Sequence, residues 1–189
     1  KILLNATHPP KRFPCGPDFV LRIAKAIENG TIKEPSQILV RIHPTHYHDK
    51  GDFGLNKETL KKYERLAEKY ESIILNIPGT CGNRIDYSFG LEENIMMNSL
   101  LRYSDVMVTM FSTMQIEAAI YDLPIVNYAI REISNIDYDK TRQDPLGVAK
   151  MPHVKRITDT NGVRTATNFN DLYLYINKYL SQPSLDKKE

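Results

Sequence analysis

Residues 103–128 read Y-S-D-V-M-V-T-M-F-S-T-M-Q-I-E-A-A-I-Y-D-L-P-I-V-N-Y, and this stretch decides the fold of the chain. An apolar run over residues 106–110 ends in a short turn, a helical pattern follows over residues 113–121, and a second apolar run lies at residues 125–128. Runs of this length and order predict a strand, a tight turn, a helix and another strand.

Two hydroxyl residues, Ser112 and Thr113, occupy the turn at the start of the predicted helix. Unpaired backbone N–H groups and the helix dipole attract anions to a helix start, so a phosphate can sit there. Glu117 follows one turn later, where its carboxylate can accept the two hydroxyl protons of a ribose. The simpler alternative is that the hydroxyls are ordinary N-caps and Glu117 an ordinary helix residue.

The rest of the chain continues the same alternation of strand and helix patterns. Strands are predicted at residues 2–6, 38–42, 72–77, 106–110, 125–128 and 162–166. Helices are predicted at residues 17–29, 57–70, 93–103, 113–121 and 170–180. Nearly continuous apolar strands between helices are typical of a parallel sheet covered on both faces. We therefore expect an α/β fold with a doubly wound, mainly parallel, six-stranded Rossmann-like sheet in the order 3-2-1-4-5-6.

Length and composition narrow the classes of function. The 189 residues fit one domain, expected at residues 1–181, and a polar, flexible tail at 182–189. The net charge of +2 is too small to favour a nucleic-acid partner. Cys15 and Cys81 match no metal or redox spacing, which favours a reducing, cytoplasmic location. The sequence begins at Lys1 and enters a strand pattern at once, so we expect a part excised from a longer protein.

The predicted topology also locates a binding site. Ligands of doubly wound sheets bind beyond the carboxyl ends of the strands, where the strand order reverses between strands 1 and 4. At that edge the first strand runs on into His8, Lys11 and Arg12, the second into His43, and the fourth into the turn at residues 111–113. Two cations and a helix start in one crevice predict a phosphate site.

Other chemistries find little support in the sequence. His43, His46 and His48 form an H-x-x-H-x-H pattern, but no carboxylate or cysteine stands beside them at ligand spacing. No G-x-G-x-x-G follows the first strand and no Walker A motif is present, which disfavours NAD binding and P-loop ATP hydrolysis. We therefore expect neither a metal nor a cofactor.

Several short motifs resemble one superfamily when taken together. Residues 40–44 resemble the K/R-x-H-P element of the CDP-glycerol glycerophosphotransferases, and residues 104–113 are similar to their S-D-x-x-I-T-D-Y-S-S. Residues 2–8 resemble the first strand and T-H-R stretch of the UDP-N-acetylglucosamine 2-epimerases. Glu117 stands seven residues before Pro124, as in the E-A-x-x-x-x-K-P pattern whose glutamate binds ribose. The layout resembles the C-terminal, donor-binding domain of GT-B glycosyltransferases.

The resemblance implies a catalytic residue in contact with phosphate, His43, and a set of substrate-binding residues: His8, Lys11, Arg12, Phe111, Ser112, Thr113 and Glu117. It also implies a nucleoside diphosphate sugar or CDP-glycerol-like donor and a partner N-terminal GT-B domain. The sequence departs from the pattern at Met110, where the family has aspartate, and at Pro9, where the epimerases have arginine. These departures count against epimerase chemistry more than against nucleotide binding.

On this basis we expect the donor half of a GT-B transferase of surface polysaccharide or glycoconjugate synthesis, inactive as this chain alone. The expected location is cytoplasmic, with peripheral association at the inner face of the membrane left open for the full-length protein. Two alternatives remain: half of a sugar-nucleotide 2-epimerase, and a non-catalytic module that binds a nucleotide or a partner.

Overall fold

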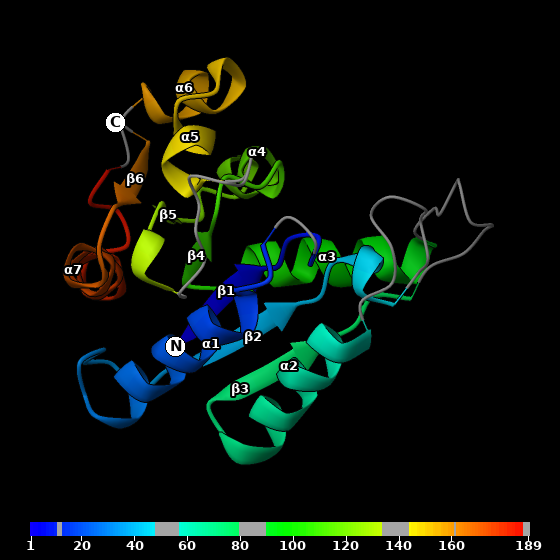
Figure 1. Ribbon diagram of the computed structural model, residues 1–189. Coiled ribbons are helices and arrows are strands. Elements are labelled where there is room, and N and C mark those ends of the chain that lie inside the picture. The colour runs from blue at the N-terminus through cyan, green and yellow to red at the C-terminus, as the bar shows by residue number, and fades with distance from the viewer. Residues whose placement is uncertain (11–12, 48–56, 80–89, 134–143, 161, 187–189) are drawn as a thin grey trace.

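The computed structural model describes residues 1–10, 13–47, 57–79, 90–133, 144–160 and 162–186. Within these residues six strands alternate with helices (Figure 1). The strands are β1 (Ile2–Ala6), β2 (Gln37–Arg41), β3 (Ile73–Asn76), β4 (Val106–Thr109), β5 (Ile125–Tyr128) and β6 (Val163–Ala166). The helices are α1 (Gly16–Glu28), α2 (Lys57–Lys69), α3 (Leu91–Tyr103), α4 (Met114–Ile120), α5 (Pro145–Ala149), α6 (Pro152–Thr158) and α7 (Phe169–Ser181), with short 3-10 helices η1 (Pro44–His46) and η3 (Arg131–Ile133).

All six strands form one parallel sheet in the order β3-β2-β1-β4-β5-β6. This confirms the predicted Rossmann-like fold and its strand order. The order reverses at β1, which pairs with β2 on one side and with β4 on the other. The carboxyl ends of these three strands therefore meet at one place on the edge of the sheet.

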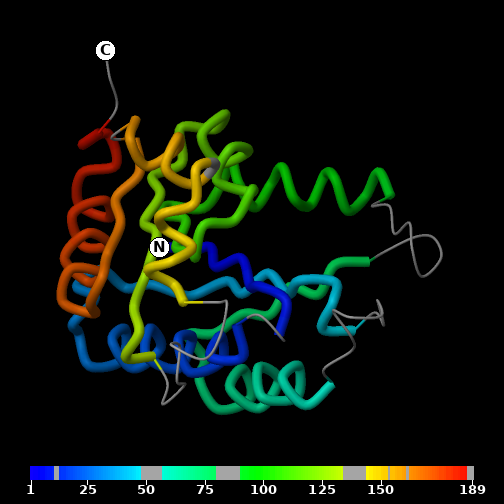
Figure 2. Tube along the Cα trace, turned by 45° about the horizontal axis from the view of Figure 1, so that its top comes forward, coloured from blue at the N-terminus to red at the C-terminus, as the bar shows by residue number. Residues whose placement is uncertain are grey.

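Helices cover both faces of the sheet, and the two cores differ in size. Residues of α1, α2 and α7 pack against one face, whereas residues of α3 and α4 pack against the other (Figure 2). Successive side chains of β2 point to opposite faces of the sheet, so Ile38 and Val40 join the larger core and Leu39 joins the smaller one. The smaller core lies on the α3 side, where Ile74 of β3 is left exposed.

Two short helices of the structure, α5 and α6, were not predicted from the sequence. Both begin at a proline, and the Asp144 side chain caps α5 by accepting the backbone N–H of Leu146 at 3.1 Å. Proline is favoured in the first turn of a helix because its missing N–H is not needed there. Helices of five and seven residues are too short to show the apolar periodicity on which the sequence prediction relied.

The end of the chain is tied to the domain as far as Asp186. The Asp186 carboxylate accepts hydrogen bonds from Arg164 of β6, with Nε–Oδ2 at 2.7 Å and Nη2–Oδ1 at 2.8 Å. It also accepts a hydrogen bond from the hydroxyl group of Tyr179 in α7. Asp186 belongs to the tail that the sequence predicts from residue 182 onward, so these contacts join one residue of that tail to β6 and α7. The flexibility of the tail stays a prediction. Residues 187–189 lie outside the described part of the chain.

Candidate functional site

A cavity of about 410 Å³ opens at the carboxyl ends of β1, β2 and β4. Six of the predicted site residues line it: His8, His43, Phe111, Ser112, Thr113 and Glu117. The remaining two, Lys11 and Arg12, lie outside the described residues. The structure thus brings together residues from three strand ends and α4, as the topology predicted.

Two buried polar side chains, Asn5 and Thr109, join β1 and β4 near their carboxyl ends. The two strands are in register at Leu3–Val106 and Leu4–Met107. Beyond these pairs, Asn5 Nδ2 donates to the carbonyl oxygen of Val108 at 2.8 Å, and Thr109 Oγ1 donates to that of Ala6 at 3.3 Å. These side-chain hydrogen bonds satisfy backbone carbonyl groups that the β1–β4 pairing no longer satisfies. The two strands can therefore separate without the free-energy cost of a buried, unpaired carbonyl group.

The turn after β4 is held by β5. Phe111 has a positive φ of 50°, which is uncommon for a residue other than glycine. Its backbone N–H donates to Asn127 Oδ1 at 3.3 Å, and Asn127 Nδ2 donates to Gln115 Oε1 at 2.9 Å. Asn127 and Gln115 are both buried. Neither residue was predicted from the sequence, although the asparagine in the apolar run I-V-N-Y was a visible signal.

Ser112 precedes Thr113, the N-cap residue of α4, and Thr113 makes no side-chain capping hydrogen bond. Ser112 makes the contact of a cap instead. Its Oγ accepts the backbone N–H of Met114 at 3.2 Å. The capping alternative therefore describes what Ser112 does in this structure, and an anion at the turn would compete with Ser112 for that donor. Glu117 is exposed on α4 and lines the same cavity.

His43 follows β2 and is held from two sides. Its backbone N–H donates to Thr7 Oγ1 at 2.8 Å, which joins it to the end of β1. Its ring Nδ1 accepts the backbone N–H of Thr45 at 3.2 Å. Because Nδ1 acts as an acceptor, a neutral His43 carries its proton on Nε2 and can donate a hydrogen bond from that atom.

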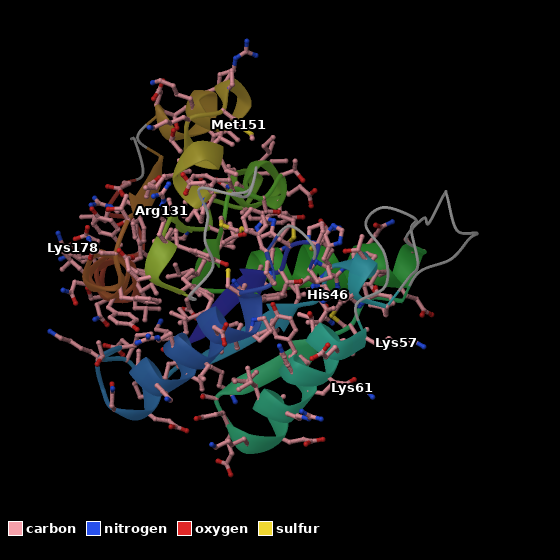
Figure 3. The ribbon with its side chains drawn as sticks, in the orientation of Figure 1. His46, Lys57, Lys61, Arg131, Met151 and Lys178 are labelled. Carbon is pink, nitrogen blue, oxygen red and sulfur yellow. The ribbon has the colours of Figure 1, made fainter. Side chains whose placement is uncertain are left out.

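His46, labelled in Figure 3, is a structural residue near the cavity. Its Nε2 lies 3.0 Å from the carbonyl oxygen of His8, and its ring meets Tyr63 of α2 edge to face at 5.6 Å. Burial lowers its pKa from 6.5 to about 4, although the His8 carbonyl acts in the opposite direction. His46 is therefore neutral near pH 7 and donates to His8. No group of three potential metal ligands occurs among the described residues, and His48 lies outside them.

Arg41 at the end of β2 also lines the cavity, a position that was not predicted from the sequence. Its side chain is 4% exposed, and Nη1 lies 2.5 Å from both Asn76 Oδ1 and Glu93 Oε1. Glu93 Oε2 in turn accepts the backbone N–H of Gly79 at 2.9 Å. Among the described residues that line the cavity, Arg41 and Glu117 carry charge. An arginine inside an otherwise apolar strand, V-R-I, was the signal for this residue.

A second cavity, of about 420 Å³, lies at the opposite edge of the sheet where β5 and β6 begin. Its lining includes Pro124 and Gly162, which precede these strands, together with Asp122 and Arg156. Ligands of doubly wound sheets bind at the carboxyl edge, so the cavity around His43 is the candidate site. Substitutions in the second cavity provide a comparison for substitutions in the first.

The strand order and the position of the first cavity define a Rossmann-like α/β domain with a cavity at its switch point. No protein-family model matches the sequence, and no curated protein matches it either. Helices long and apolar enough to cross a bilayer are absent from the described part of the chain.

Proposed function

We propose that this chain is the donor-binding domain of a GT-B-type transferase. It binds the nucleoside diphosphate part of a nucleotide sugar, or a CDP-glycerol-like donor, in the cavity around His43. One observation carries this proposal: a single cavity at the switch point is lined by His8, His43, Ser112, Thr113 and Glu117, which come from separate segments of the chain. Its volume of about 410 Å³ falls within the usual range of small-molecule sites, roughly 300–1,000 Å³.

The proposed roles follow from the chemistry of the lining residues. Glu117 accepts hydrogen bonds from the ribose hydroxyls, and the imidazole Nε2–H of His43 donates to a phosphate oxygen. In transfer from a nucleotide sugar, the acceptor oxygen bonds to the anomeric carbon and its proton passes to a base on the acceptor side. The bond between the anomeric carbon and the phosphate oxygen breaks, and the nucleoside diphosphate leaves with added negative charge. Preorganised donors aimed at that charge lower the barrier. The acceptor is bound by the other GT-B domain, so we expect this chain to bind donor and to turn over nothing alone.

A ligand screen tests the proposal. Thermal unfolding of the chain is measured with UDP, CDP, GDP and ADP, and with a sugar nucleotide of each, followed by calorimetry for every compound that raises the melting temperature. At least one nucleotide should stabilise the protein, because a ligand that binds the folded state alone shifts the equilibrium by mass action.

Two variants locate the bound nucleotide. Substitution Glu117→Ala, in the cavity around His43, should weaken binding, whereas Arg156→Ala, in the second cavity, should leave it unchanged. The reverse result would move the site to the amino edge of the sheet. Absence of any nucleotide binding would contradict the proposed function, and binding without transferase activity in the full-length protein would favour a non-catalytic module.

A further inference from the structure

A buried ion pair stands beside the proposed binding site. Arg41 is the neighbour of Ala6 across β1 and β2, and both residues line the cavity. Along β2, Leu39 belongs to the core on the α3 side, so the side chain of Arg41 leaves the strand on that same face. There it meets Glu93, which comes from the first turn of α3.

The partners of Arg41 already balance its charge. A buried guanidinium is costly unless an opposite charge and hydrogen bonds satisfy it. Glu93 supplies the opposite charge and Asn76 a hydrogen-bond acceptor. The Glu93 side chain is 14% exposed, and its Oε2 accepts the N–H of Gly79. A phosphate entering the cavity therefore meets a cation whose field is largely cancelled by a neighbouring carboxylate.

We propose that Arg41 is the cation that a ligand phosphate shares with Glu93, and that Glu93 thereby sets the affinity of the cavity for anions. The identity of the ligand rests on the proposed function, but the competition between two anions for one guanidinium does not. A guanidinium has five N–H donors in a planar fork, so it can serve a carboxylate and a phosphate together. Sharing weakens each interaction, which suits a site that must release its nucleotide after transfer.

The competition can be measured with anions and their uncharged counterparts. Binding of inorganic pyrophosphate, UDP, CDP, GDP and ADP is compared with binding of the matching nucleosides by calorimetry. The variant is Glu93→Gln, which keeps a side-chain hydrogen-bonding group near Arg41 but removes the negative charge. The control is Glu92→Gln, which makes the same change in net charge at an exposed neighbour in the same helix.

We expect Glu93→Gln to bind pyrophosphate and the nucleotides about ten-fold more tightly than the wild type, because removing a charge several ångströms away in a partly buried site changes the Coulomb energy appreciably. Nucleoside affinity should not change, and Glu92→Gln should behave as the wild type. A merely structural role for Glu93 would not separate nucleotides from nucleosides in this way.

Equal anion affinities for Glu93→Gln and Glu92→Gln would overturn the proposal while leaving the proposed function standing. Tighter pyrophosphate binding by Glu93→Gln, without nucleotide binding by any of the proteins, would support the role of Arg41 and Glu93 and contradict the proposed function. If Glu93→Gln fails to fold, the double variant Arg41→Gln/Glu93→Gln removes both charges and leaves no unpaired ion. We expect it to bind the anions several-fold more weakly than the wild type, and unchanged anion affinity would overturn the role of Arg41.

Discussion

At the scale of single residues, the side chains in and near the cavity around His43 differ in whether they face the cavity or support the backbone. Glu117 is exposed and lines the cavity, whereas His46 is buried and holds the backbone of His8. The Glu117 carboxylate is therefore available to a ligand, while Nε2 of His46 is committed to the backbone of His8. The two residues should therefore respond differently to substitution.

Substitution Glu117→Ala should weaken nucleoside diphosphate binding by about 1–3 kcal/mol, the range for losing hydrogen bonds to a charged group. The free energy of unfolding should change little, because an exposed glutamate in α4 is replaced by another good helix former. Calorimetry and urea denaturation measure the two effects. Glu92→Ala, at an exposed position of α3, is the matched control. Lost stability with unchanged affinity would instead assign Glu117 to the packing of α4.

The folding stability should depend on pH through His46. Its pKa is near 6.5 when unfolded and about 4 when folded, so the unfolded chain takes up this proton first as the pH falls. The contribution of neutral His46 to the free energy of unfolding is complete above pH 6.5. It is lost as the pH falls from 6.5 to 4, to a total of about 2–3 kcal/mol. Substitution His46→Gln should flatten the profile of unfolding free energy over this range. Identical profiles for the two proteins would contradict the assignment.

At the scale of elements, the strands and their order could be predicted because the strands are nearly continuous apolar runs between helices. Six of the predicted site residues line one cavity because they follow the ends of β1, β2 and β4 or, for Glu117, lie in α4. Their roles stay a prediction. What could not be predicted is the set of long-range polar contacts: Arg41 with Glu93, and Asn127 with Phe111 and Gln115. The first contact joins β2 to α3, and the others join β5 to the preceding helix and turn, 12 and 16 residues back. No local pattern specifies which partner a buried polar side chain will find.

Substitution Asn127→Ala tests how β5 supports the turn after β4. The change leaves the N–H of Phe111 and the buried amide of Gln115 without their partner, which should cost about 1–3 kcal/mol of stability. We expect a lower midpoint of urea denaturation and weaker nucleotide binding together, because Phe111 belongs to the cavity lining. Asn170→Ala, at an exposed position of α7, is the matched control and should change neither quantity.

At the scale of the whole molecule, the two sides of the sheet are unequal. Helices α1 and α3 each have 13 residues, yet α1 buries six of them and α3 buries Leu101. Burial of apolar surface is the main source of stability, so the side carrying α3 is held less firmly than the side carrying α1. The cavity around His43 is lined in part from the less firmly held side, by Met97 of α3.

The consequence is a difference in how readily the two sides open to solvent. Backbone amides of α3 should exchange with deuterium through local opening, well before those of α1, which should exchange only with global unfolding. Hydrogen-exchange mass spectrometry measures both, and equal protection of the two helices would contradict the expectation. A nucleotide bound beside Met97 and Arg41 should slow deuterium exchange along α3 more than along α1. The exchange rate of the less stable layer of helices would therefore report whether the site is occupied.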